Sequence, residues 1–228
     1  MIGIIGAMKI ETDALKALVQ NKTTEVISGI EFVSGTVGAH RVVVAQCGIG
    51  KVFAALCAQT MILHFGVTRL INVGVAGTLS ESVGLLDTVV ATSLVQHDMD
   101  TSPLGDPVGL ISGINIVHIP TSPALVAAVT SAAARAGMKV ITGTVASGDQ
   151  FIADRAAKDR IRDSFGASAC EREGAAIAHV CYVGGVECAV IRTISDNADD
   201  TAGTMEYPEL CVHAAKQSQL LLDEFFKA

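Results

Sequence analysis

Short apolar runs alternate with amphipathic, helix-like segments along the whole chain, and this alternation strongly limits its possible folds. Runs such as Ile2–Ile5 are apolar at consecutive positions, which is typical of strands buried on both faces of a sheet. Intervening segments such as Lys9–Gln20 place apolar residues at helical spacing. The order predicts an α/β fold. No repeat, low-complexity tract or linker interrupts residues 1–228, so we expect one domain.

The same pattern predicts the individual elements. Expected strands are Ile2–Ile5, Glu31–Val37, Arg41–Gln46, Arg69–Val73, Asp87–Val95, Val140–Ala146 and Cys188–Ile194. Expected helices are Lys9–Gln20, Ile49–Phe65, Ser122–Ala136, Asp154–Ser164, Glu173–Val183 and Glu206–Phe226. The second and third strands are expected to form a hairpin around Gly38-Ala39.

Composition excludes several classes of protein. Half of the 228 residues are hydrophobic and only 4% are aromatic, so aliphatic side chains must fill a large core. The net charge is −7 and the Lys and Arg residues are scattered singly. A nucleic-acid surface needs clustered positive charge, so we expect no nucleic-acid partner.

Cysteine spacing and hydropathy indicate where the protein works. The six cysteines include no C-x-x-C pair, which predicts buried free thiols in a reducing, cytoplasmic compartment and no zinc site. The uncharged stretch 107–134 is interrupted by Pro120 and Pro123, so it is not expected to span a membrane. The short apolar N-terminus lacks a basic leading region, so we do not read it as a secretion signal. We expect a soluble protein.

Glycines follow several expected strands: Gly6 after the first, Gly48 and Gly50 after the hairpin, and Gly74 and Gly77 after the next one. In open α/β sheets ligands bind beyond the carboxyl ends of strands, where glycine lets the backbone approach closely. We therefore expect the binding site at this edge. Neither a G-x-G-x-x-G nor a P-loop motif is present, so neither a nicotinamide enzyme nor an ATPase is indicated.

Acidic residues occur near several strand ends. Glu11 lies in the first turn of the first helix, where a catalytic role and simple complementation of the helix dipole are both open. Asp149 follows a strand and is interpreted as a helix cap rather than a catalytic acid. In Glu171-Arg172-Glu173, which opens a helix, a solvated capping cluster and a site facing a crevice are equally compatible with the pattern.

The last apolar strand carries a buried-type arginine and ends in an acid. Arg192 lies inside the strand, and a charged side chain there requires a partner. Asp196 at its end is a natural catalytic acid, although a capping aspartate would show the same pattern.

Several segments, taken in order, resemble one family. They are Ile4-Ile5-Gly6-Ala7-Met8 with Glu11, Gly48 to Val52, Asn72 to Gly77, Ser147 to Ile152, Glu171 to Val180, Arg192 to Asp196 and Ala214 to Ser218. This ordered set resembles the 5′-methylthioadenosine/S-adenosylhomocysteine nucleosidases of the nucleoside phosphorylase superfamily. Each motif alone is weak, but the ordered set is specific and runs from the first strand to the last helix.

The resemblance implies a fold and an activity. The fold would be a three-layer α/β/α arrangement around a central mixed, partly barrel-like sheet, usually in a homodimer. The activity would be hydrolysis of the N-glycosidic bond of 5′-methylthioadenosine and S-adenosylhomocysteine, which releases adenine and the 5-thio-substituted ribose. The partner would be a small nucleoside, and neither a metal ion nor an organic cofactor is required.

The resemblance also implies residue roles. Asp196 would be the general acid at adenine N7, and Ser195 would orient its carboxyl group. Glu11 would position and deprotonate the attacking water with Arg192 nearby, and Glu173 would hold the ribose 2′- and 3′-hydroxyls. The remaining binding set is Phe151 stacking on adenine, Ile152 reading its edge, Tyr207 lining the 5′ pocket, and Val75, Ala76, Gly77 and Arg172 near the sugar.

The chain departs from the family pattern around the sugar. Arg172 stands where relatives usually carry Met, and it either points outward paired with Glu171 or recognises an anion, namely free phosphate or a charged 5′ substituent. Val75 stands where Ser or Thr is usual, and the loop from Leu104 to Gly113 is altered.

These departures keep other activities open. One is a purine nucleoside phosphorylase that uses phosphate, although Glu11 would repel that anion and only Lys9 lies nearby. Another is hydrolysis of aminodeoxyfutalosine or 5′-deoxyadenosine. A silent nucleoside-binding sensor is the alternative from another class, and it would have no evident use for a water-activating Glu11.

Overall fold

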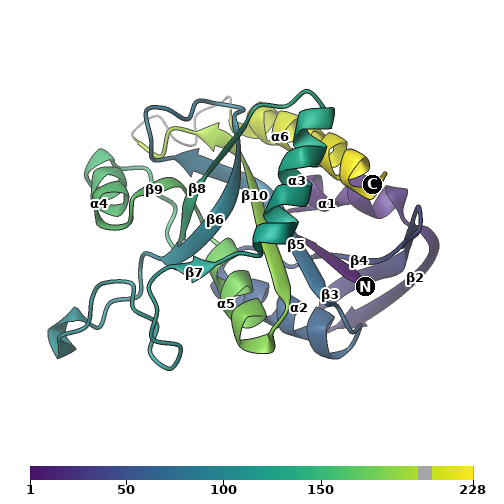
Figure 1. Cartoon of the computed structure of the whole chain (residues 1–228), viewed down its shortest axis with the longest axis horizontal. Helices are drawn as coiled ribbons and strands as arrows, with labels where there is room; N and C mark the ends of the chain where they lie inside the picture. Colours follow the sequence, from purple (N-terminus) through teal and green to yellow (C-terminus); the bar gives the residue numbers. More distant parts are fainter. Residues whose placement is uncertain (200–206, 228) are drawn as a thin grey trace.

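The computed structural model describes residues 1–199 and 207–227. Within them, ten strands form one mixed sheet flanked by helices (Figure 1). The strands are β1 (Ile2–Gly6), β2 (Gln20–Ile27), β3 (Ile30–Val37), β4 (His40–Gln46), β5 (Arg69–Thr78), β6 (Thr88–Gln96), β7 (Ile119–Pro120), β8 (Val140–Ser147), β9 (Ala167–Glu171) and β10 (Glu187–Asp196). The helices are α1 (Lys9–Leu18), α2 (Lys51–Leu63), α3 (Pro123–Arg135), α4 (Arg155–Phe165), α5 (Gly174–Gly184) and α6 (Tyr207–Phe226), with a 3-10 helix at Ser102–Leu104.

Part of the sheet closes into a barrel. The strand order in this part is β10-β6-β8-β9-β5, and β10 pairs in parallel with β5 to complete the ring. From β5 the sheet continues outward through β1, β4, β3 and β2. Parallel pairs such as β6–β8 and antiparallel pairs such as β5–β9 both occur. The expected mixed, partly barrel-like sheet is therefore confirmed.

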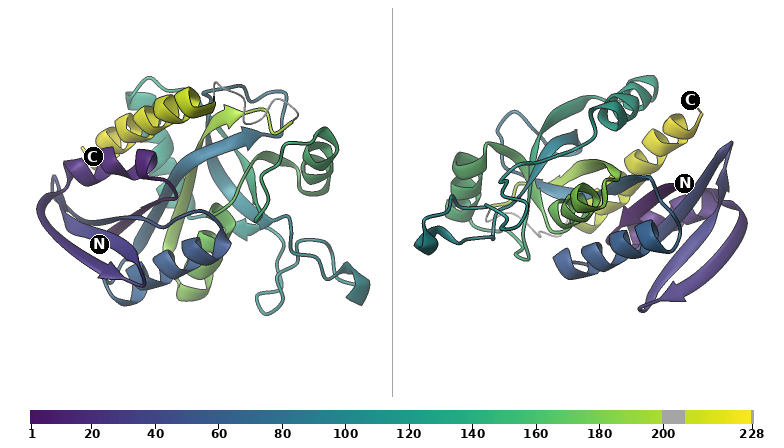
Figure 2. Two further views of the ribbon diagram at one scale, coloured as in Figure 1. Left: turned by 180° about the vertical axis from the view of Figure 1, so that it is seen from behind. Right: turned by 60° about the horizontal axis from the view of Figure 1, so that its bottom comes forward.

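Helices cover both faces of the sheet and give the expected three layers (Figure 1). On one side α1, α3 and α6 pack together, and Leu15, Val129 and Leu222 join one apolar cluster. On the other side α2 packs against α5, where Met61 and Ile177 belong to a second cluster, as the turned views also show (Figure 2). Helix α4 lies beside the barrel against β8 and β9. As the composition predicts, aliphatic side chains make up most of both clusters.

Some elements differ from the expectation. The segment Lys9–Gln20 is not helical throughout, because α1 ends at Leu18 and Gln20 begins β2. Strand β2 is exposed at most positions and polar, so it lacks the apolar signal by which a strand is recognised. Strand β9 is short and built largely from small residues, which have little strand preference. The expected hairpin is present as β3 and β4.

Two further expectations concern cysteines and membranes. All six cysteines are buried, as the spacing predicts. Among the helices of residues 1–199 and 207–227, none combines the length and the apolar character that a membrane crossing needs.

The parallel strands β1, β5 and β10 bring the chemistry to one edge. Ile5 lies opposite Asn72, and Arg192 lies opposite Gly74, so the three strands run side by side in one direction, although β1 ends earlier than β5 and β10. The carboxyl ends of the strands, which include Gly6 of β1 and Asp196 of β10, therefore point toward the same edge of the sheet.

Candidate active site

A cavity of about 330 Å³ opens at the carboxyl ends of β1, β5 and β10. All of the predicted site residues except Arg192 and Tyr207 line it, and Met8, Ile49, Gln150, Cys170 and Glu171 complete much of its wall. The predicted lining residues are Glu11, Val75, Ala76, Gly77, Phe151, Ile152, Arg172, Glu173, Ser195 and Asp196. Arg192 is buried in β10, and Tyr207 begins α6 with its side chain outside the described part of the structure.

Glu11 points from the first turn of α1 into the cavity wall. Its Oε2 accepts hydrogen bonds from the N–H groups of Ala7 (2.8 Å) and Met8 (2.9 Å), and Oε1 accepts one from Val75 (3.3 Å). Burial raises the pKa of this carboxyl group, although these N–H groups and the Arg192 guanidinium oppose the shift. Glu11 thus caps its own helix, as the simpler reading expected, while its carboxyl group borders the cavity and is suited to accept a proton.

Arg192 finds its partner in Glu171. The Arg192 side chain is only 1% exposed, and its Nε and Nη2 both donate to Glu171 Oε2. Nη2 also donates to Asn72 Oδ1, and Nη1 donates to the Ile191 carbonyl at 2.8 Å. A partner for Arg192 was expected, but the suggested pairing of Glu171 with Arg172 is wrong, because Glu171 is committed to Arg192.

Glu171 is also the cap of α5. Its carboxylate accepts hydrogen bonds from the backbone N–H groups of Glu173 (3.0 Å) and Gly174 (2.8 Å) and from the Ser147 hydroxyl. Burial opposes its ionisation, but Arg192 and these donors outweigh that effect and hold its pKa below the ordinary value. Sequence reasoning recorded Glu171 in an acidic cluster and left its role open. A permanently ionised, structural acid is the role that the contacts define.

Glu173 begins α5 with its carboxyl group turned to the cavity. Its Oε1 accepts a hydrogen bond from Gly50 N at 2.8 Å, which ties β9–α5 to the start of α2. Burial, together with the nearby charge of Glu171, raises the pKa of Glu173 to about 7. This group can therefore change its protonation state near neutral pH.

Asp196 ends β10, and its carboxyl group is held at both oxygens. The Ser195 hydroxyl donates to Oδ2 at 3.0 Å and Ala198 N donates to Oδ1 at 2.8 Å. A Cβ on Gly77 would lie 2.6 Å from Asp196 Oδ1, so only glycine on β5 leaves room for the carboxyl group. Burial raises the pKa of Asp196, which favours the protonated form that an acid catalyst needs.

The loop after β8 forms another part of the wall. Phe151 is half-exposed with its ring at the cavity, whereas Ile152 is buried. Asp149 anchors this loop, because its Oδ1 accepts a hydrogen bond from Lys51 N (2.9 Å) and its N–H donates to Asp98 Oδ2 (2.9 Å). The capping reading of Asp149 is confirmed, although it caps α2 across the chain rather than a neighbouring helix.

Sequence reasoning missed the Lys51–Asp98 ion pair that supports this anchor. Lys51 Nζ lies 2.6 Å from Asp98 Oδ1, and both side chains are mostly buried. No local motif connects the two residues, and only the glycine at position 50 signals the close approach. Gly50 has φ +102°, and a Cβ there would lie 3.0 Å from Asp149 Oδ1.

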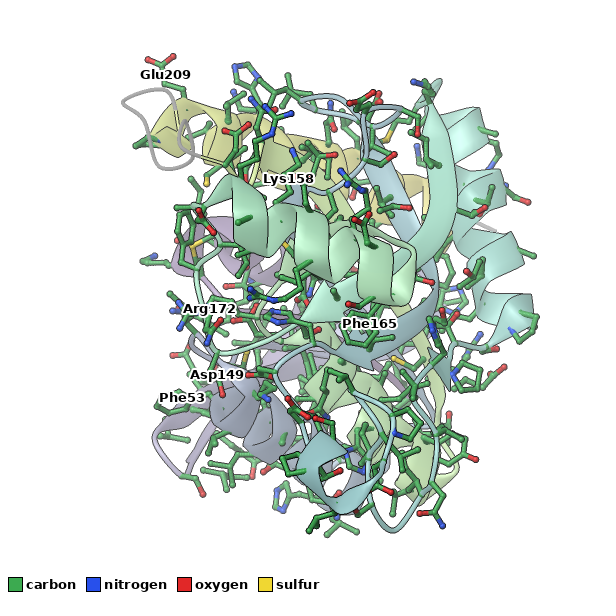
Figure 3. The ribbon with its side chains drawn as sticks, turned by 90° about the vertical axis from the view of Figure 1, so that its left-hand side faces the viewer. Phe53, Asp149, Lys158, Phe165, Arg172 and Glu209 are labelled. Atoms are coloured by element: carbon green, nitrogen blue, oxygen red, sulfur yellow. The ribbon has the colours of Figure 1, made fainter. Side chains whose placement is uncertain are left out.

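Arg172 lines the cavity and lies on the same side of the molecule as Asp149 and Phe53 (Figure 3). It is partly buried, and its Nε is shielded from solvent without a hydrogen-bond partner in the described part of the chain. These two observations favour the reading in which Arg172 faces the site over the reading in which it points outward. Within that part of the chain, no group of three or more His, Cys, Asp or Glu side chains is arranged to hold a metal ion.

A barrel-closing mixed sheet with acidic groups around a cavity at its strand ends defines an α/β protein of the nucleoside phosphorylase type. The family model described as the phosphorylase superfamily matches residues 1–227. The chain belongs to this superfamily and, within it, to the 5′-methylthioadenosine/S-adenosylhomocysteine nucleosidase family.

Similar proteins cover almost the whole chain. An aminodeoxyfutalosine nucleosidase from Helicobacter pylori is 39% identical and covers 98% of both chains. A 5′-methylthioadenosine/S-adenosylhomocysteine nucleosidase from Shewanella halifaxensis is 34% identical over 99% of this chain and 98% of its own. A mutant Helicobacter pylori nucleosidase solved with 5′-methylthioadenosine in its active site gives a TM-score of 0.94 at 37% identity, covering 99% of this chain and 97% of that one.

Proposed function

We propose that the protein hydrolyses the N-glycosidic bond of 5′-methylthioadenosine and S-adenosylhomocysteine, releasing adenine and the 5-thio-substituted ribose. The observation that carries this proposal is the set of three carboxyl groups, on Glu11, Glu173 and Asp196, which face one cavity and all have raised pKa values. The family membership and the names of the relatives support it.

The leaving group needs an acid. Adenine is a poor leaving group as an anion, so a proton or a strong hydrogen bond at N7 must draw electrons from the breaking bond. Asp196 serves as this general acid, since burial keeps its proton available and Ser195 fixes its orientation. A positioned proton donor contributes on the order of 10²–10⁴ in rate.

The sugar becomes an oxocarbenium-like cation as the bond stretches, and nearby carboxylates stabilise it electrostatically. Glu11 positions the attacking water and takes its proton, while Glu173 holds the ribose 2′- and 3′-hydroxyls. Arg192 is a positioning residue, because it acts through Glu171, whose carboxylate fixes the start of α5 and hence Glu173.

The remaining residues of the cavity place the substrate. Phe151 stacks on adenine and the backbone of Ile152 reads its edge. The β5 segment from Val75 to Gly77 lies beside the sugar.

We further propose that the 228-residue chain is a single cytoplasmic domain, works as a homodimer and serves methionine salvage. An exposed apolar strip on and beside α2 supports the dimer, since such a strip is a common sign of an interface. The strip consists of Ile49, Val52, Phe53 and Leu56.

Hydrolysis of aminodeoxyfutalosine is a second candidate, favoured by the Helicobacter pylori relative of that name and by the arginine at the cavity. Phosphorolysis is less compatible, because the Glu11 carboxyl group already occupies the Ala7 and Met8 N–H groups that could bind an anion near the first strand.

The test is a chromatographic assay for adenine with 5′-methylthioadenosine, S-adenosylhomocysteine, adenosine and aminodeoxyfutalosine, each with and without phosphate. Adenine release from the thio-nucleosides without phosphate is the expected result. Release only with phosphate would assign a phosphorylase instead, and no release from any nucleoside would refute the proposal.

A further inference from the structure

Arg172 has no part in the proposed mechanism, yet it lines the reaction cavity. It lies between Glu171 and Glu173 at the start of α5, partly buried, and Figure 3 shows it on the same side of the molecule as Asp149. Its Nε is buried and has no hydrogen-bond partner among residues 1–199 and 207–227. A buried polar group without a partner costs free energy, so a ligand that supplies the missing acceptor would be favoured.

The neighbouring carboxyl groups do not satisfy this guanidinium. Glu171 is fully engaged by Arg192, Ser147 and the first N–H groups of α5. The Glu173 carboxyl group accepts its hydrogen bond from Gly50 N. Arg172 therefore lines the cavity with an unpaired Nε, while Glu171 and the Oε1 of Glu173 are engaged by other groups.

The chemistry of the substrate determines what this charge can bind. Adenine and ribose are neutral, and the proposed contacts of Asp196 and Glu173 already use the base and the ribose hydroxyls. A substrate can then carry an anion only on its 5′ substituent. The planar guanidinium matches a carboxylate, with which it forms paired, charge-assisted hydrogen bonds.

We infer that Arg172 is a specificity-determining residue that binds a carboxylate on the 5′ substituent of the nucleoside. This inference rests on the proposed hydrolase activity and adds to it a preference for adenine nucleosides whose 5′ group carries a carboxylate. It also accounts for the electrostatics, because a bound carboxylate neutralises a cation that would otherwise oppose the positive charge developing on the ribose.

The test uses a matched pair of substrates that differ only in charge. They are a 5′-thioadenosine with a carboxylate at the end of its thioether chain and the isosteric carboxamide, supplied as a series of chain lengths. The readout is kcat/KM for adenine release at low salt. Because the two substrates differ by one charge-assisted contact, kcat/KM for the best carboxylate is expected to exceed that for its carboxamide by about 10–100-fold in the wild type.

Three variants assign this preference to one residue. In Arg172→Met the carboxylate-to-carboxamide ratio is expected to fall to about one, whereas Arg172→Lys retains part of it because the charge remains without the planar fork. Arg160→Met, on the exposed face of α4, removes the same charge outside the cavity and should keep the wild-type ratio. Carboxamide turnover by each variant shows that the protein has folded, and 0.5 M NaCl should reduce the wild-type preference.

Each other outcome contradicts one specific statement. This inference is overturned if the wild type releases adenine from both substrates with a ratio near one at every chain length. It is also overturned if Arg172→Met leaves the ratio unchanged. Neither result contradicts the proposed hydrolase activity. Stimulation of adenine release by inorganic phosphate that is lost in Arg172→Met would show that the guanidinium binds a free anion instead. No adenine from either substrate while 5′-methylthioadenosine is cleaved would overturn this inference alone, and no adenine from any of the three would refute the proposed function with it.

Discussion

The buried ion pair between Glu171 and Arg192 supplies the strongest single prediction about stability. The two side chains are 2% and 1% exposed, and Glu171 also accepts hydrogen bonds from Ser147, Glu173 and Gly174. In Glu171→Gln one carboxylate oxygen becomes an NH₂ group. This hydrogen-bond donor then faces the groups that donate to Glu171 in the wild type. The Arg192 charge then remains buried in β10 without its counter-ion.

The size of the loss follows from this geometry. Removing one partner of a buried ion pair costs about 3–5 kcal/mol, because the other charge is left uncompensated. An independent estimate of the loss in free energy of unfolding has the same size. Each hydrogen bond to a charged group is worth roughly 1.5–3 kcal/mol, and several are affected here. For a chain of this length, such a loss lowers Tm by roughly 6–20 °C.

Urea unfolding followed by circular dichroism, at one fixed protein concentration, measures the effect. Glu81→Gln on the exposed surface is the matched control and should change the free energy of unfolding by less than about 0.5 kcal/mol. The double variant Glu171→Met with Arg192→Met should recover much of the loss, because it removes both charges. If Glu171→Gln costs less than about 1 kcal/mol, Arg192 has found another partner and the reasoning from an uncompensated charge is wrong.

Three further predictions concern the cavity. Asp196→Asn should abolish most turnover while calorimetry shows nucleoside binding within about tenfold of the wild type, and near-normal turnover would remove Asp196 as the acid. Glu173 keeps its proton up to about pH 7 in the folded protein but only to about 4.5 when unfolded, so its contribution to stability should fall as pH rises across that window. Unfolding at several pH values should show this component in the wild type and not in Glu173→Gln. Gly50→Ala should cost about 1–3 kcal/mol in urea unfolding, since φ +102° with ψ +162° is a conformation nearly restricted to glycine and the Cβ meets Asp149, and an unchanged midpoint would contradict that strain.

The strands that position the site could be predicted because their signal is local. β1, β5 and β10 are nearly continuous apolar runs, which is what burial on both faces of a sheet requires. Glycines and an aspartate near the ends of these runs predict a site at the carboxyl edge of the sheet. The structure brings Gly74, Gly77 and Asp196 to one cavity.

The barrel closure and the edge strand depend on contacts that no local pattern records. β10 pairs with β5 although the two strands are far apart in the sequence, so the ring follows from tertiary pairing alone. Strand β2 is held by its partner β3 and faces solvent at most positions, so its composition is that of a loop.

The roles of the acids also depended on tertiary structure. The sequence identified Arg192 as needing a partner but could not choose it, because the partner, Glu171, is brought near by the β8–β9 part of the barrel. The suggested pairing of Glu171 with Arg172 fails for a simple reason. Consecutive residues at the end of an extended strand point in different directions, so Glu171 meets Arg192 while its neighbour Arg172 does not.

One carboxylate therefore links stability and chemistry. Glu171 stays ionised beside Arg192, and through the N–H groups of Glu173 and Gly174 it fixes the start of α5, from which the Glu173 carboxyl group reaches the cavity. The same negative charge also helps to raise the pKa of Glu173. A variant that loses the Glu171 charge but still folds should have two effects on Glu173. The pKa of Glu173 should fall, because the nearby negative charge is gone, and its carboxyl group should move, because the start of α5 is no longer fixed. Stability and substrate affinity are then expected to fall together in Glu171→Gln, whereas Asp196→Asn should affect turnover alone.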